Sequence, residues 1–138
     1  MFDRIVLAVD GSEHSDRAAE AAAELARDSA TEVLVLHFAE LGAAGRAGPI
    51  PLEQPGEAST LVNRVTEELR GRGVTARGKA YAVLTSDVAP QIISEAAAFG
   101  ASLIVMGTRG RSDFAALLLG SVAHKVIHHA QCPVLVTR

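Results

Sequence analysis

The sequence has 138 residues, which is enough chain for one domain with a buried core and too little for two. Its net charge of -3 and isoelectric point near 5.9 argue against a nucleic-acid-binding protein, because such proteins usually present a basic face; a single nucleotide stays an acceptable ligand. One cysteine rules out an internal disulfide, and we find neither a signal sequence nor the roughly 20 apolar residues that cross a bilayer, so we expect one cytoplasmic domain over residues 1–138 without membrane partners.

The first three expected elements form a parallel crossover unit. Arg4 to Val9 is apolar on both alternating faces, which is typical of a strand inside a parallel sheet covered on both sides. Asp10-Gly11-Ser12 is a turn signal, and Ser12 or Ser15 can cap the alanine-rich helix expected over Ser15 to Ser29. A second strand is expected over Thr31 to Phe38, so the order is strand, helix, strand.

The middle of the chain changes composition before it returns to regular structure. Residues 41–56 are rich in glycine, alanine and proline and are expected to form a connecting loop, or alternatively a lid near a ligand. A helix with one apolar stripe is expected over Glu57 to Gly73. The third strand, Val74 to Val83, is interrupted by Gly78 and Lys79, which favours an edge position.

The last third continues the alternation. Ser86 or Asp87 is expected to cap a helix that ends at Phe99, and a fourth strand follows over Ala101 to Met106. A final helix is expected from Gly120 to about Ala130, and a fifth strand over Pro133 to Thr137. Five strands alternating with four helices predict an α/β fold with an open, doubly wound, five-stranded parallel sheet.

The segment between the fourth strand and the last helix carries a glycine pattern, G-x2-G-x9-G-S, formed by Gly107, Gly110, Gly120 and Ser121. The first N–H groups of a helix lack internal partners and stabilise anionic oxygens. Glycines there would allow positive φ and a close approach of the main chain to a phosphate. Glycines that merely form turns are the alternative.

The ends of strands one, two and four are expected to lie along one rim of the sheet. Ligands of doubly wound sheets bind at the carboxyl ends of the strands, where the strand order reverses. If strands one and four are neighbours, Asp10 and Gly107 flank the same crevice. The sequence therefore predicts a binding site there.

Together these motifs resemble the universal stress protein family, in its nucleotide-binding form. The resemblance covers essentially the whole chain: I-V-L-A-V-D-G-S-E-H-S at residues 5–15, L-H at 36–37, V-M-G-T-R-G-R-S at 105–112 and C-P-V-L-V-T-R at 132–138. It implies a Rossmann-like, adenine nucleotide alpha hydrolase-like sheet with strand order 3-2-1-4-5. It also implies ATP binding, with Mg²⁺ or Mn²⁺ as the candidate cation.

The resemblance also implies residue roles. Asp10 would hydrogen-bond the ribose or help to hold a metal, the main chain near Phe38 would meet adenine, and the glycine N–H groups and Ser121 would take the phosphates. Phe38 departs from the family's usual valine, which leaves ring stacking and partial blockage both open. Arg109 could add positive charge at the phosphates or be an ordinary exposed arginine. The full set of implied nucleotide contacts is Val9, Asp10, Gly11, Ser12, Phe38, Met106, Gly107, Arg109, Gly110, Gly120, Ser121 and Val122.

We therefore expect a nucleotide-dependent regulatory or stress-response module, and we considered three alternative interpretations. An ATPase or autophosphorylating enzyme would need activating groups, and no G-x-x-x-x-G-K-[ST] loop is present, so at most slow hydrolysis is expected. A nucleotide-free dimerisation module conflicts with the intact glycine pattern. A metal site at His124 and His128 lacks a third ligand at matching spacing.

The final strand is apolar and is expected at a sheet edge, which predicts a homodimer through residues 133–138. The family resemblance also implies this dimer. We further expect a protein partner, which the sequence does not identify.

Overall fold

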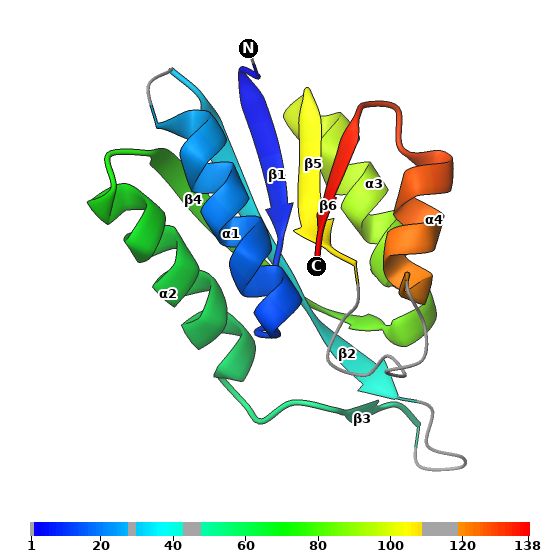
Figure 1. Ribbon diagram of the computed structural model, residues 1–138. Coiled ribbons are helices and arrows are strands. Elements are labelled where there is room, and N and C mark those ends of the chain that lie inside the picture. Colours follow the sequence, from blue (N-terminus) through cyan, green and yellow to red (C-terminus); the bar gives the residue numbers. More distant parts are fainter. Residues whose placement is uncertain (1, 28–29, 43–47, 109–118) are drawn as a thin grey trace.

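The computed structural model describes residues 2–27, 30–42, 48–108 and 119–138. They form a sheet with helices on both faces (Figure 1). The elements in chain order are β1 (Arg4–Ala8), α1 (Glu13–Ala26), β2 (Glu32–Gly42), β3 (Ile50–Pro51), α2 (Glu57–Gly71), β4 (Thr75–Leu84), a 3-10 turn (Thr85–Asp87), α3 (Val88–Phe99), β5 (Leu103–Gly107), α4 (Ser121–His129) and β6 (Val134–Thr137).

The strand order confirms the doubly wound prediction. Five parallel strands lie in the order β4-β2-β1-β5-β6, which is the predicted order 3-2-1-4-5 in the numbering of the expected strands. One detail of the prediction is wrong. The short strand β3 pairs antiparallel with the end of β2, Leu41 opposite Pro51 and Gly42 opposite Ile50, so part of the expected 41–56 loop adds a sixth, antiparallel strand.

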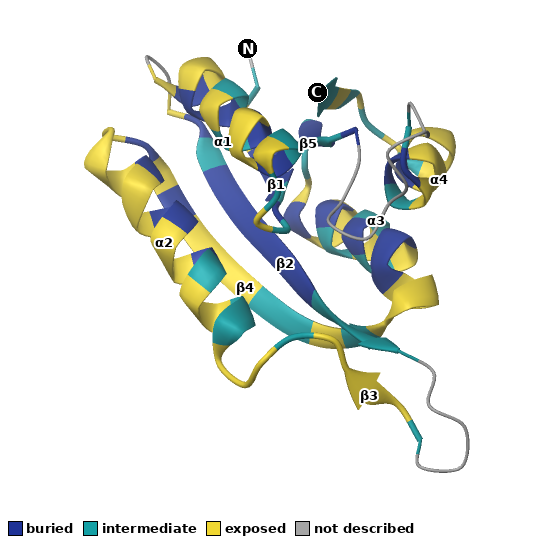
Figure 2. Cartoon of the chain, turned by 60° about the horizontal axis from the view of Figure 1, so that its bottom comes forward, coloured by how far each residue is buried: buried dark blue, intermediate teal, exposed yellow. Residues whose placement is uncertain are grey.

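The two faces of the sheet carry separate apolar cores because side chains alternate along each strand. Val33 and Val35 of β2 pack with α1 and α2, whereas Leu34 and Leu36 pack with α3 and α4. Burial of both faces explains why the strand sequences are apolar without interruption, and Figure 2 shows the centre of β2 buried between the two layers. Among the described residues, no helix is long and apolar enough to cross a membrane.

The ends of helices α1 and α3 agree only in part with the predicted caps. Ser12 caps α1 as expected, its side chain accepting a hydrogen bond from the Ser15 N–H at 3.2 Å. Gly100 ends α3 in the left-handed conformation, with φ of 71°. Asp87 is the N-cap residue of α3, one of the two expected positions, but it ends a 3-10 turn and its side chain makes no capping hydrogen bond. Helix α1 ends at Ala26, three residues earlier than expected.

Glycine 78 is explained by helix packing rather than by weak strand structure. A Cβ there would lie 2.2 Å from Val62 Cγ1 and 2.7 Å from Thr66 Oγ1, so α2 can approach β4 only over a glycine. Of the strands that the structure describes, β4 pairs only with β2, so it lies at the sheet edge, as expected. Its exposed Arg77 and Lys79 make that edge unattractive to a further strand.

Strand β2 is longer than predicted, and this extension shapes the rest of the molecule. Its pairing with β1 stops at Leu36, while its pairing with β4 continues to Leu41. Phe38 therefore lies within the strand and not at its end. Together with β3, the extension forms a wall that projects beyond the carboxyl ends of β1 and β5 (Figure 1).

Candidate functional site

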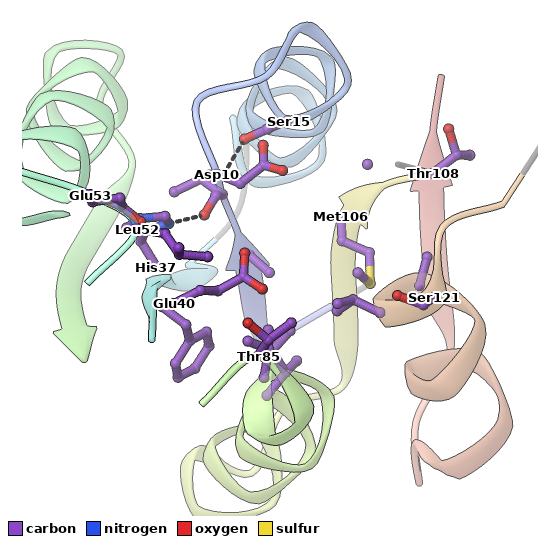
Figure 3. A pocket seen from close by; sticks show the side chains of 18 residues that line it. Asp10, Ser15, His37, Glu40, Leu52, Glu53, Thr85, Met106, Thr108 and Ser121 are labelled. Carbon is purple, nitrogen blue, oxygen red and sulfur yellow. Dashed lines mark hydrogen bonds and ion pairs between the residues drawn. The ribbon is translucent and has the colours of Figure 1, made fainter. Parts of the chain in front are cut away.

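A cavity of about 360 Å³ opens at the carboxyl ends of β1 and β5, beside the part of β2 that extends past them. It lies at the boundary where the chain order of the strands reverses, between β1 and β5. The β2 extension with residues 52–53 walls one side, and the starts of α3 and α4 wall the others (Figure 3). Its lining consists of Ala8, Val9, Asp10, Ser15, His37, Phe38, Glu40, Leu52, Glu53, Thr85, Val88, Ile92, Met106, Gly107, Thr108, Ser121, Val122 and Ala123.

The turn after β1 holds Asp10 at the cavity. The Asp10 carboxylate accepts a hydrogen bond from the Ser12 N–H at 2.9 Å, and the Asp10 N–H donates to Ser15 Oγ at 3.0 Å. Gly11 between them has φ of 83°, a conformation that suits glycine. The Ser12 hydroxyl is used as the α1 cap. Asp10 and Val9 therefore line the cavity, whereas Gly11 and Ser12 shape the turn and do not line it.

Gly107 lines the cavity, but its conformation differs from the expectation. Its φ is not positive, so left-handed backbone is not what selects glycine here. A Cβ at this position would lie 2.7 Å from His14 Cβ and 2.9 Å from the His14 carbonyl carbon, so glycine is required where α1 packs onto the end of β5. Two hydrogen bonds hold His14 of α1 at this position. Thr108 Oγ1 lies 3.1 Å from His14 Nδ1, and Thr137 Oγ1 donates to the His14 carbonyl oxygen at 2.8 Å.

The start of α4 faces the cavity from the β5 side. Gly120 is the N-cap residue with φ of −68°, and its N–H donates to the Thr108 carbonyl at 2.6 Å, which ties α4 to the end of β5. No side chain of the described residues caps this helix. Ser121 and Val122 line the cavity, while Gly120 does not. Arg109 and Gly110, the other predicted contacts of this region, lie outside the described residues.

Phe38 and Met106, two of the predicted contacts, both line the cavity. Phe38 is 5% exposed and stacks on Tyr81, with ring centroids 5.7 Å apart and an interplanar angle of 13°. Its ring thus has a partner within the protein and also lines the cavity. The Tyr81 hydroxyl donates to Glu95 at 2.8 Å, and this hydrogen bond, with burial and the Glu95 charge, raises the pKa of Tyr81. Met106 lines the opposite wall.

Sequence reasoning missed the acidic and histidine side of the site. Neither His37, within the second expected strand, nor Glu53, within the expected 41–56 loop, is among the predicted contacts, yet both line the cavity (Figure 3). His37 Nδ1 lies 2.7 Å from the Val9 carbonyl oxygen, and Nε2 lies 2.8 and 3.0 Å from the two carboxylate oxygens of Glu53. Glu40, from the β2 extension, adds a third carboxylate beside Asp10 and Glu53. The signal that could have identified this side of the site is Glu53 itself, an acidic residue within the glycine- and proline-rich 41–56 segment.

His124, His128 and Cys132 are not among the residues that line this cavity. His124 and His128 on α4 are exposed, with ring centroids 4.4 Å apart. Within the described ranges, no group of three or more histidine, cysteine or acidic side chains is arranged to hold a metal ion. Burial raises the pKa of the Cys132 thiol, which fits a packing role better than a reactive one.

Comparison with known proteins identifies relatives over the full length. The universal stress protein family model matches residues 1–138. A universal stress protein of Thermus aquaticus is 36% identical over 145 aligned residues and YxiE of Bacillus subtilis is 32% identical over 151, each match covering 100% of both chains. The solved universal stress protein of Archaeoglobus fulgidus in complex with dAMP has a TM-score of 0.71 and 25% identity, over 100% of this chain and 98% of that one.

Proposed function

This chain belongs to the universal stress protein family, and on that premise we propose that its cavity binds an adenine nucleotide, with ATP as the working ligand. One observation carries the proposal: the Asp10 carboxylate and the first residues of α4 border the same cavity. An acceptor for sugar hydroxyls and a helix N-terminus for phosphates are the two unlike groups that a nucleotide needs. The dAMP complex of the relative supports this ligand class.

Each wall suits a different part of the ligand. The base would lie near Phe38 and Val9, where apolar surface and main-chain groups meet. The ribose hydroxyls would donate to Asp10. The phosphates would lie toward Gly107 and Ser121, where the main chain leaves β5 and enters α4.

A divalent cation would fit this arrangement only if the nucleotide supplied some of its coordinating oxygens. Carboxylate and hydroxyl oxygens are ligands that Mg²⁺ and Mn²⁺ accept, so Asp10 and Ser121 are the candidate protein ligands. Since no group of three metal-binding side chains occurs in the described part of the chain, phosphate oxygens and water would supply the other positions. The cation would neutralise phosphate charge.

We assign the protein a regulatory role and at most slow hydrolysis. The titratable side chains among the described cavity residues are Asp10, Glu40, Glu53 and His37, and these include no lysine or arginine to stabilise a transferring phosphate. Ligand binding would instead change the partner affinity of a cytoplasmic dimer, which requires that the two states bind ATP with different affinities.

The proposed dimer uses the β6 edge. Within the described ranges, β6 pairs with β5 on one side and with no strand on the other, and its Leu135 is 38% exposed. A second copy would cover this apolar edge. We expect Val134→Lys to give a monomer by light scattering. An unchanged mass would contradict the β6 interface.

The nucleotide proposal is tested by denaturing the purified protein and identifying any released nucleotide, followed by calorimetric titration with ATP, ADP and AMP. Asp10→Ala should weaken ATP binding by at least about tenfold, because the carboxylate hydrogen bonds to sugar hydroxyls are lost. Asp3→Asn, at the opposite end of the sheet, is the matched control and should bind normally. Normal binding by the Asp10 variant would contradict the assigned ribose contact, and absence of binding by the native protein would contradict the function.

A further inference from the structure

His37 is held between two hydrogen-bond acceptors. Its Nδ1 lies 2.7 Å from the Val9 carbonyl oxygen, a group that can only accept, so Nδ1 carries a proton. Its Nε2 faces both carboxylate oxygens of Glu53, at 2.8 and 3.0 Å. A protonated carboxyl group would present its hydroxyl from one oxygen only. Contact with both oxygens therefore favours a proton on Nε2 and an ionised Glu53.

The two side chains are shielded from water, 4% exposed for His37 and 12% for Glu53. An ion pair in such surroundings is held strongly once formed, because removing one partner leaves an uncompensated charge. His37 thus joins two segments, the β1 end at Val9 and the 52–53 wall of the cavity (Figure 3).

Glu53 is directed at His37 by backbone contacts on both sides. The Leu52 N–H donates to the Glu40 carbonyl at 3.0 Å, which continues the β2–β3 pairing. The Gln54 N–H donates to Glu57 Oε2 at 2.9 Å, and the Glu57 N–H donates back to the Gln54 carbonyl. These two fixed points leave Glu53 on a short, ordered span at the cavity edge, so its contact with His37 is built into the fold.

We propose that His37 and Glu53 form a buried imidazolium–carboxylate pair, and that Glu53 is a positioning residue for nucleotide binding. The pair fixes the Val9 carbonyl, and with it the Asp10 peptide, relative to the wall that carries Leu52 and Glu40. Neither member needs to touch the ligand. This inference rests on the proposed nucleotide site, because the residue being positioned is Asp10.

The charge state is tested without a ligand by ¹⁵N NMR of the histidine side chains at neutral pH. We expect N–H signals from both ring nitrogens of His37 in the native protein, and loss of the Nε2 proton signal in Glu53→Ala. An unprotonated Nε2 in the native protein would overturn the ion pair.

The positioning role is tested by calorimetric titration with ATP. Coupling between sites is typically worth a factor of about 5–150 in affinity, and we expect Glu53→Ala to lose ATP affinity within that range. Glu53→Gln, which retains a hydrogen bond without the charge, should recover part of the loss. Glu68→Gln, which removes an exposed i,i+4 pair with Arg64, is the matched control and should bind as the native protein does.

These measurements distinguish a failure of the Glu53 positioning role from a failure of the nucleotide-binding function. Native affinity in Glu53→Ala, measured beside a native protein that binds ATP, would overturn the positioning role alone. A native protein that binds none of ATP, ADP and AMP would overturn the nucleotide function and the positioning role together, while the NMR result would still decide the ion pair.

Discussion

Replacement of Gly107 by alanine tests whether this glycine serves helix packing. The new Cβ would lie 2.7 Å from His14 Cβ, about 0.7 Å short of the 3.4 Å at which ordinary contact begins, and 2.9 Å from the His14 carbonyl carbon. Because the second atom belongs to the backbone, a rotamer change cannot relieve the clash. Helix α1 would have to move away from β5, against the hydrogen bonds that join Thr108 and Thr137 to His14.

The expected cost follows from these contacts. Overpacking typically costs about 1–3 kcal/mol and a lost hydrogen bond about 1 kcal/mol, so we expect a loss of about 2–4 kcal/mol of unfolding free energy. For a domain of this size that lowers the melting temperature by roughly 5–15 °C. The protein should still fold, since total stabilities are about 5–15 kcal/mol.

Thermal and urea unfolding followed by circular dichroism measure this loss. The matched control is Gly71→Ala in α2, where an added Cβ meets no atom within 4 Å, and where alanine should stabilise the helix by up to about 1 kcal/mol. A melting temperature unchanged in Gly107→Ala would refute the packing argument. If ATP affinity fell while stability did not, close approach of a phosphate would be the better explanation for this glycine.

Two further predictions concern local hydrogen bonds. The chain has one tyrosine and no tryptophan, so its phenolate absorbance reports Tyr81 alone; the midpoint should lie above the ordinary value of 10.0 and fall in Glu95→Gln. The hydrogen bond should stabilise the fold below that ordinary pKa and be lost as pH rises through the raised one, so a midpoint insensitive to Glu95 would show that the bond does not form in solution. Ser12→Ala should cost about 1 kcal/mol in urea unfolding, because the α1 cap is lost, and should leave ATP affinity nearly unchanged; a large drop in affinity would instead place Ser12 at the ligand.

The strand and helix order could be predicted because each signal was local. Runs such as Ile5 to Leu7 are apolar on both faces and are buried on both faces, and Asp10-Gly11-Ser12 carries its own turn and cap. The end of β2 could not be read in this way. Ala39 and Glu40 look like the start of a loop, and only pairing with β4 extends the strand through them.

The candidate site was predictable to a similar degree. Positions at strand ends, such as Asp10 and Met106, were found because parallel strands bring their carboxyl ends to one rim. Contacts between distant segments were not visible. Gly107 looked like a phosphate-loop glycine because its partner, His14, is far away in sequence, and Glu53 looked like connecting chain because its partner, His37, lies across the cavity.

The extension of β2 past Leu36 also divides this strand into two regions whose backbone hydrogen bonds should open with different free energies. From Glu32 to Leu36 the strand is bonded on both sides, so amide hydrogen exchange there should require global unfolding. At Phe38 and Ala39 it pairs with β4 and, among the described strands, with none on its other side, so this part can open more readily than the centre. If the proposed nucleotide bridges this part of β2 and α4, it would slow exchange at Phe38 and Ala39 and leave the centre of the strand unaffected. Exchange at these two amides would then report whether the cavity is occupied.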